Sequence, residues 1–293
     1  MEITINTTRE DNIGQQLINI KGFLNDTNDI DFKELVLNFK NFKYSPPLLA
    51  VFFAAFSENL EENNIINARP NSYLDSIYFP NGLNPDEIEN WEERLNSYIN
   101  KSYLPLIHFS TSTIEELAQQ RNNVISCACR MIRDITNIPT NYYSGISYLI
   151  SEITDNIVDH SRQDRGWISF QHYPANGYLD LCLADSGRGL LKSYQEYRGE
   201  NDYSHINTHI DALDNAIKGY STKHLKERGF GVHTSREMLI KGLKGTFVMI
   251  SGNAIMANYK LTDFQCFYEG TLIMIRIPSQ EPDSNFNVIN YVE

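Results

Sequence analysis

Apolar positions recur along this chain with two different periods, and the change from one to the other outlines its elements. In residues 113–135 and 143–161 apolar side chains return every three or four positions, which predicts two amphipathic helices. Residues 167–173 and 178–184 are compact runs rich in β-branched and aromatic side chains, which favour strands. Turn residues at 174–177 (Pro-Ala-Asn-Gly) predict that these two strands form a hairpin.

The rest of the second half continues the alternation of helices and strands. Helices are predicted at residues 206–218 and 232–243, and strands at 246–251, 254–260 and 271–277. Helices and strands interspersed along 293 residues predict an α/β protein, with enough chain for two modest domains or one large one.

The first hundred residues have their own order of elements. Strands are predicted at 2–6, 33–39 and 104–109, a helix at 11–24, and an apolar helix at 48–60 after Pro46-Pro47. The strand and apolar helix within residues 31–60 resemble the STAS-type fold of anti-sigma-factor antagonists. That resemblance would make Ser45 the nearest counterpart of their phosphorylated residue. A plain α/β accessory domain is the alternative.

Composition narrows the range of partners. The formal net charge of −12 argues against general nucleic-acid binding, because a phosphate backbone attracts a basic surface. The longest apolar run, residues 46–56, is too short to cross a bilayer, and the first residues carry no secretory signal pattern. The four cysteines have no metal-ligand spacing. A cytoplasmic protein without a nucleic-acid or membrane partner is therefore expected.

The helix predicted over residues 143–161 concentrates polar side chains on one side. At about 100° per residue, Glu152, Asp155, Asn156 and Asp159 share that side, while isoleucines gather on another. Such a stripe is commonly a solvated helix face. The motifs that follow it in the chain decide between that reading and a functional one.

Glycine-rich turns come after the hairpin and before the next helix. Asp185 ends the second hairpin strand, where its carboxylate can accept a hydrogen bond from an exocyclic amine. Gly187 and Gly189 would let the backbone approach a flat ring, although a strand-ending turn without a ligand is the alternative. Residues 228–232 (Arg-Gly-Phe-Gly-Val) place free N–H groups at a helix start, which favours a phosphate. Hydroxyl and ammonium donors precede them at residues 221–223 (Ser-Thr-Lys).

The order of these motifs is similar to that of the GHKL superfamily of ATP-binding domains, the histidine kinase-like ATPases. It includes gyrase-type topoisomerases, MutL-type repair proteins, sensor histidine kinases and anti-sigma-factor serine kinases. The resemblance covers residues 114–278 and implies a two-layer α/β sandwich, with a mixed sheet and helices on one face. The domains would then be residues 1–110 (accessory, STAS-like), 111–280 (ATP-binding) and 281–293 (tail).

The resemblance implies which residues bind the metal, which residue acts as the general base, and which residues contact adenine. Asn156 would coordinate the Mg²⁺ that bridges the phosphates of ATP, and Glu152 would be the general base. Asp185 would bind the adenine amino group, and Gly187 and Gly189 would shape the wall of the site around the adenine ring.

Further roles concern the phosphates and the support of the base site. The residues implied to close over or contact the phosphates are Ser221, Thr222, Lys223, Arg228, Gly229 and Gly231. Thr271 would support Asp185, and Thr246 is the competing assignment because each follows a glycine at a predicted strand start. Asp159 and His160 are expected to be surface or supporting polar residues of the same helix.

Four activities fit this resemblance. A sensor histidine kinase should carry a His on the preceding helix, and residues 113–135 contain none. An anti-sigma-type serine kinase would use Glu152 to activate a hydroxyl of a partner protein. A gyrase- or MutL-type ATPase would activate water instead, and it normally has a transducer domain after the ATP site, where only residues 279–293 remain. A non-catalytic module would switch partner binding with ATP.

The expectation from the sequence is an ATP/Mg²⁺-binding regulatory protein with slow kinase or ATPase chemistry and a protein partner. Its oligomeric state, a homodimer included, stays open.

Overall fold

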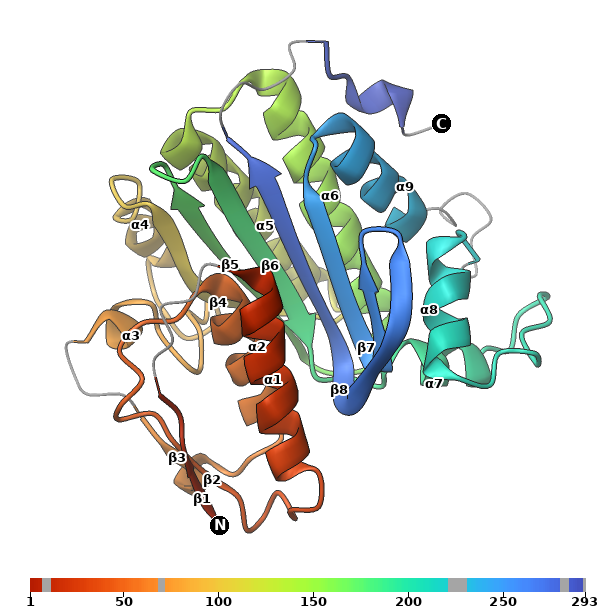
Figure 1. Ribbon diagram of the computed structural model, residues 1–293. Coiled ribbons are helices and arrows are strands. Elements are labelled where there is room, and N and C mark those ends of the chain that lie inside the picture. The colour runs from red at the N-terminus through yellow and green to blue at the C-terminus, as the bar shows by residue number, and fades with distance from the viewer. Residues whose placement is uncertain (7–11, 68–71, 221–230, 280–284, 292–293) are drawn as a thin grey trace.

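A five-stranded sheet forms the centre of the molecule (Figure 1). The computed structural model describes residues 1–6, 12–67, 72–220, 231–279 and 285–291. The strands of the central sheet are β4 (Tyr103–Ser110), β5 (Arg165–Tyr173), β6 (Tyr178–Asp185), β7 (Thr246–Ala257) and β8 (Lys260–Pro278), in the spatial order β4-β5-β6-β8-β7. Neighbouring strands are antiparallel throughout, because hairpins join β5 to β6 and β7 to β8. The predicted α/β sandwich is confirmed, but its sheet is antiparallel rather than mixed.

One face of this sheet is covered by helices from residues 115–242 of the chain. These are α5 (Glu115–Thr136), α6 (Thr140–His160) and α9 (Gly231–Glu237), which continues as a π-helical turn (Met238–Gly242). The predicted isoleucine stripe of α6 is buried against the sheet, with Ile150 in one core with Phe170 of β5. Burial of that stripe fixes the rotation of α6 about its axis. The polar residues Glu152 and Asn156 therefore lie on its flank.

The opposite face is covered by the first region of the chain, through α1 (Ile13–Thr27) and α2 (Pro47–Ser57) (Figure 1). All 11 residues of α2 are buried, since this helix is apolar on every side and packs between α1 and the sheet. Phe52 of α2 lies 5.7 Å, between ring centroids, from Tyr268 of β8. The predicted one-sided helix layer thus describes residues 111–280 alone, and the whole chain has helices on both faces. No helix in the described ranges is both long and apolar enough to cross a membrane.

A second, small sheet lies in the first region. Its parallel strands are β1 (Glu2–Thr4), β2 (Val36–Asn38) and β3 (Ile65–Ile66), and α1 and α2 connect them in turn. The strand predicted at residues 104–109 does not join this sheet. As β4 it pairs with β5 of the central sheet, with Ser110 opposite Arg165. Short helices α3 (Tyr73–Ser76) and α4 (Trp91–Asn96) lie between the two sheets in the sequence.

The β7–β8 hairpin is longer than predicted, and its tip folds back. The two strands predicted before residue 260 are largely one strand, β7, bent by register shifts around Gly252. At the tip, Asn258 donates its backbone N–H to the Phe247 carbonyl (2.7 Å), and its side chain accepts from the Phe247 N–H (2.9 Å). These bonds tie the tip to the start of β7, a contact that local sequence patterns do not predict.

Two short helices complete the surroundings of the site. They are α7 (Gly189–Gln195), which begins directly after the Asp185 turn and was not predicted, and α8 (His209–Ile217), which agrees with the predicted helix at 206–218. Thr208 caps α8 through a capping box with Asp211.

Candidate functional site

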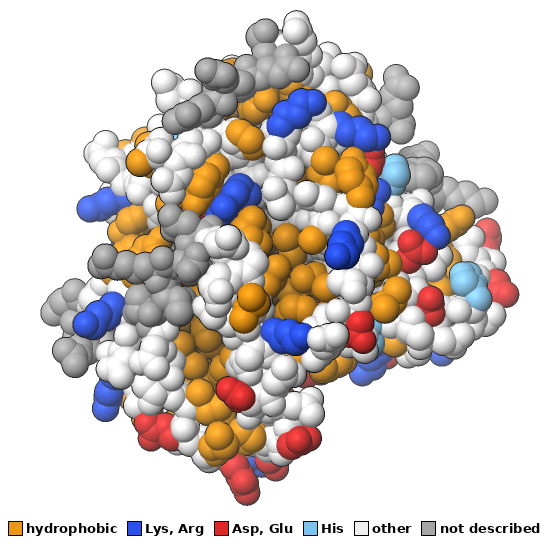
Figure 2. All heavy atoms as spheres, viewed as in Figure 1, with side chains coloured by type: hydrophobic (Ala, Val, Ile, Leu, Met, Phe, Trp, Pro, Cys, Tyr) orange, Lys and Arg blue, Asp and Glu red, His pale blue; other side chains and the backbone are white. Residues whose placement is uncertain are grey.

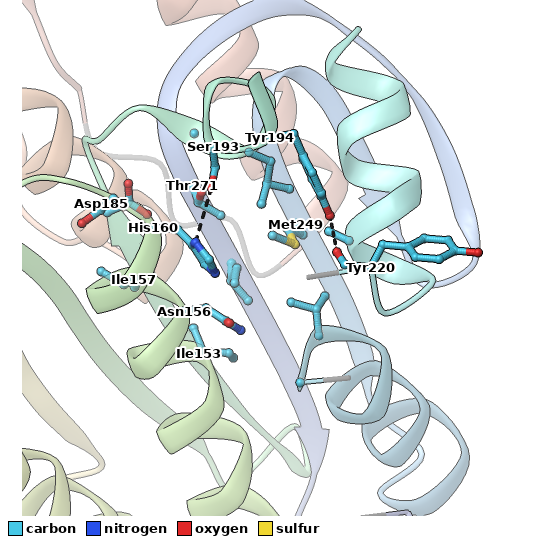
Figure 3. A pocket seen from close by; sticks show the side chains of 17 residues that line it. Ile153, Asn156, Ile157, His160, Asp185, Ser193, Tyr194, Tyr220, Met249 and Thr271 are labelled. Atoms are coloured by element: carbon cyan, nitrogen blue, oxygen red, sulfur yellow. Dashed lines mark hydrogen bonds between the residues drawn. The ribbon is translucent and has the colours of Figure 1, made fainter. Parts of the chain in front are cut away.

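A pocket lies between α6, the end of β6, the interior of β8 around Thr271, and helices α7 to α9 (Figure 3). It contains about 710 Å³ of empty space, part of it open to solvent. Five residues singled out in the sequence line it: Asn156, Asp185, Gly189, Gly231 and Thr271. Its apolar walls include Ile153, Ile157, Leu190, Val232, Met249 and Ile273. The fold therefore brings together residues from α6, β6, α7, β8 and α9.

Asp185 is the most buried carboxyl group of the pocket wall. It is the last residue of β6, is 2% exposed, and accepts a hydrogen bond at Oδ1 from the N–H of Gly187 (2.9 Å). Burial raises the pKa of Asp185 to about 7, against the opposing effect of hydrogen bonds from Gly187 and Thr271. The carboxyl group is thus near its titration midpoint at neutral pH and can serve as an acceptor for a ligand N–H when ionised.

The register of β6 against β8 distinguishes the two candidate threonines. Thr271 stands directly opposite Asp185 and hydrogen-bonds to its carboxylate, and it lines the pocket. Thr246 begins β7 and stands opposite Arg276, at the other end of the sheet. Of the two, Thr271 has the position that support of Asp185 requires.

The two glycines after Asp185 have different surroundings. A Cβ added at Gly187 would lie 2.2 Å from the carbonyl oxygen of Ser161, so this glycine makes room for the end of α6. Gly187 does not appear in the wall of the pocket. Gly189 does line the pocket and has a φ of +66°, a conformation that favours glycine.

Asn156 points into the pocket from α6 (Figure 3). Its amide nitrogen Nδ2 is buried and has no hydrogen-bond partner within the described residues. A buried donor without a partner costs about 1–3 kcal/mol, so native proteins seldom leave one without a reason. The orphaned amide is consistent with a ligand that completes its hydrogen bonding.

Glu152 lies one helical turn before Asn156 and beside the start of α9. A Cβ added at Gly231 would lie 2.3 Å from Glu152 Oε2 and 3.7 Å from Asn156 Nδ2, so only a glycine fits there without a shift. Glu152 is also hydrogen-bonded to Tyr148, whose pKa is raised to about 12, by burial first and then by this carboxylate. The structure thus brings Glu152, Asn156 and Gly231 together, although Glu152 itself is not part of the pocket wall.

The polar groups at this end can be tested for their fit to Mg²⁺. The described residues contain no group of three or more His, Cys, Asp or Glu side chains that could hold a metal by themselves. Mg²⁺ in nucleotide sites is usually held by one or two protein oxygens, by phosphate oxygens and by water. The side-chain amide of Asn156 can supply one such oxygen, and Glu152 lies near it beside Gly231. These residues therefore fit a metal that arrives with a phosphate ligand.

Part of the predicted phosphate contact set cannot be placed. Ser221, Thr222, Lys223, Arg228 and Gly229 lie outside the described residues.

The pocket also contains residues that sequence reasoning did not assign to it. His160, expected to be a surface or supporting residue, lines the pocket, and its Nδ1 lies 3.3 Å from Ser193 Oγ of α7. Arg188 donates from Nε to the His160 carbonyl (2.7 Å) and pairs with Glu196 (2.7 Å). His160 lies four positions after Asn156, so the two share one face of the helix. That spacing was the feature of the sequence that could have placed His160 at the pocket. No comparable signal marked α7.

No model of a known protein family matches this chain, and no curated protein is similar to it in sequence.

Proposed function

We propose that the pocket binds an adenine nucleotide with Mg²⁺, and that the chain is a cytoplasmic regulatory protein of the histidine kinase-like ATPase type. It would either phosphorylate a partner protein or change its affinity for that partner with ATP occupancy. The alternatives are an ATP hydrolase of the gyrase or MutL type and an interaction module without turnover.

One observation supports this proposal above the others. Asp185, a buried carboxyl group, and Asn156, whose amide Nδ2 is buried and has no partner among the described residues, line the same pocket. A carboxylate can accept from the adenine amino group, and an amide oxygen can bind the Mg²⁺ of a nucleoside triphosphate. Apolar walls between them suit a purine ring.

The position of Glu152 bears on the type of reaction. Glu152 lies against Gly231 and is hydrogen-bonded to Tyr148. To act as a general base, it must also reach the acceptor hydroxyl or water near the γ-phosphate. When bound, Mg²⁺ would neutralise charge on the phosphates. Glu152 would then hold the proton that leaves the nucleophile.

Ser45 receives no support as an acceptor within the same chain. Ser45, the nearest counterpart of the phosphorylated residue in STAS-type antagonists, is 2% exposed, and its hydroxyl donates to the Pro46 carbonyl (3.0 Å). A phosphoryl group could not reach that hydroxyl in this fold. A separate partner protein is therefore the proposed acceptor.

Calorimetric titration of the protein with ATP, with and without Mg²⁺, tests the proposal directly. Wild type should bind, and both Asp185→Ala and Asn156→Ala should bind more weakly. Asp159→Ala removes an exposed carboxylate from the same helix and should match wild type. The proposal fails if wild type binds no nucleotide, or if the two pocket variants behave like the control.

Turnover then separates the candidate activities. Glu152→Gln keeps the size of the side chain but removes the base, so a kinase or ATPase should lose turnover and retain ATP binding. Labelled ATP with candidate partner proteins distinguishes phosphotransfer from hydrolysis. An ATP-responsive partner affinity that persists in Glu152→Gln would favour the module without turnover.

A further inference from the structure

The C-terminal segment 285–291 returns to the helical layer, far along the chain from the helices that it contacts (Figure 1). Within this segment Phe286 alone is buried, with 6% of its surface exposed. Its ring lies 5.3 Å from that of Tyr142 on α6 and 6.0 Å from that of Tyr291, with which it is stacked. Phe286 is therefore the main anchor of the segment, and Val288 and Tyr291 pack partly buried against the same core.

The Phe286 ring lies in a socket formed by two glycines on two different helical elements. A Cβ added at Gly145 of α6 would lie 2.9 Å from the ring, and one added at Gly242 of the π-helical turn would lie 2.5 Å from it. Asn141, in the first turn of α6, donates from Nδ2 to the Phe286 carbonyl (3.0 Å). The side chain and backbone of Phe286 thus bridge α6 to the end of the α9 segment.

The same two elements also meet at the pocket. Farther along α6, Glu152 lies directly against Gly231, the first residue of α9, with Asn156 next to it. The seven residues of α9 and the five of the π-helical turn run without a break from this contact to the Phe286 socket. A π-helical turn is a rare and less favourable geometry than an α-helix, so tertiary contacts must hold it. Phe286 against Gly242 is such a contact.

We propose that segment 285–291 is a strap that holds α9 against α6 and thereby sets the geometry of the pocket wall formed by Glu152, Asn156 and Gly231. A shift of α9 at the socket is transmitted to Gly231 because one short, continuous helical segment joins the two places. The strap can detach because one buried ring and two partly buried side chains, rather than a strand or a long helix, hold it. Its release loosens the side of the pocket that carries Asn156. The Asp185 side stays unchanged, because it belongs to the sheet.

Three substitutions in the full chain release the strap in different ways. Phe286→Ala removes the anchor. Gly145→Ala and Gly242→Ala fill the socket from either side, while alanine in a helix is otherwise favourable. Gly22→Ala on α1, where an added Cβ meets nothing within 4 Å, is the matched control for the glycines. Ile289→Ala, with Ile289 69% exposed on the same segment, is the control for Phe286.

Hydrogen–deuterium exchange provides a readout that does not require a ligand. The three releasing variants should exchange at least about five-fold faster in peptides covering 285–291 and 231–242, whereas the β5–β6 hairpin should keep its wild-type protection. Both controls should match wild type throughout. The proposal is overturned if residues 285–291 are released in these variants while residues 231–242 exchange as in wild type. It is equally overturned if the hairpin loses protection to the same extent, because the effect is then general unfolding.

Nucleotide affinity provides the second readout, and this part rests on the proposed function. The releasing variants should bind ATP with Mg²⁺ about five-fold more weakly, with little change for adenosine, which does not use the Asn156 side. Equal losses for both ligands would contradict the assigned side of the pocket. If wild type binds neither ligand, the proposed function fails, and the exchange experiment still decides whether the strap holds α9.

Discussion

The Asp185 end and the Asn156 end of the pocket differ in how far the protein satisfies its own polar groups. Asp185 ends a buried strand and accepts hydrogen bonds from Gly187 and Thr271. Asn156 lies on the flank of a helix, and its buried Nδ2 has no partner in the described part of the chain. One end is thus complete without a ligand, while the other has an unmet hydrogen bond.

The difference follows from the elements that build each end. Paired strands fix Asp185 and Thr271 opposite each other through backbone hydrogen bonds on both sides. Glu152, Asn156 and Gly231 depend on the packing of α6 against a short helix that begins at the pocket. We therefore expect the Asp185 end to be preformed before a ligand binds, and the Asn156 end to become ordered by the ligand. The predictions below separate these two contributions.

The largest effect is expected at the preformed end. Asp185→Ala removes the proposed acceptor for the adenine amine, and hydrogen bonds to a charged group contribute about 1.5–3 kcal/mol. Affinity for ATP should fall roughly 10- to 100-fold, and affinity for adenosine should fall equally, because both carry the base. Titration calorimetry measures both ligands. A loss confined to ATP would place the base elsewhere.

Asn156→Ala should have a smaller and more selective effect. ATP with Mg²⁺ should bind roughly ten-fold more weakly, while adenosine should bind as to wild type. The ligand-free protein should become more stable by about 1 kcal/mol, since the substitution removes a buried donor without a partner and alanine favours a helix. Calorimetry and denaturant unfolding measure the two quantities. A destabilised variant would mean that the protein itself satisfies this amide.

The pH dependence of binding should report Asp185 specifically. If the ionised carboxylate is the form that accepts from adenine, a pKa of about 7 leaves roughly a tenth of the protein competent at pH 6 and half at pH 7. Adenosine should then bind about five-fold more weakly at pH 6 than at pH 7. Asp185→Asn, which cannot titrate, should bind with the same affinity at both values. Adenosine is the suitable probe because it carries no phosphate.

The same pKa has a consequence for stability. The folded protein keeps the Asp185 proton up to about pH 7, whereas the ordinary pKa of an aspartate side chain is 3.8. Between these values the folded state binds more protons than the unfolded state, so the free energy of unfolding should fall as pH rises through this window. Asp185→Asn should remove that part of the slope in urea unfolding experiments. A slope that persists in the variant would assign it to other groups.

The sequence predicted the parts of the fold that depend on local periodicity. The isoleucine stripe of α6 and the hairpin around residues 174–177 are both present, because each is encoded within one or two neighbouring elements. The partner of β4 was not predictable, since it lies in β5, beyond two helices. The folded tip of the β7–β8 hairpin depends on a contact between Asn258 and Phe247, which no periodic pattern encodes.

The candidate site shows the same division. Spacing along one helix brought out Glu152 and Asn156, but the role of His160 in the wall of the pocket needed the position of α7. Thr271 and Thr246 each follow a glycine and look equivalent in the sequence. Strand register, a long-range property, separates them.

That pair of threonines allows the finest test of the preformed end. Thr271→Val keeps the shape of the side chain but removes the hydroxyl that helps to hold the pKa of Asp185 down. The pKa of Asp185 should rise further, so the midpoint of adenosine binding should move above pH 7. Affinity at pH 7 should then fall about three-fold and recover at pH 8. Thr246→Val, at the far end of the same sheet, should leave both the affinity and its midpoint unchanged. Equal behaviour of the two variants would show that Thr271 supports Asp185 only through its backbone, and that the strand pairing alone completes this end of the pocket.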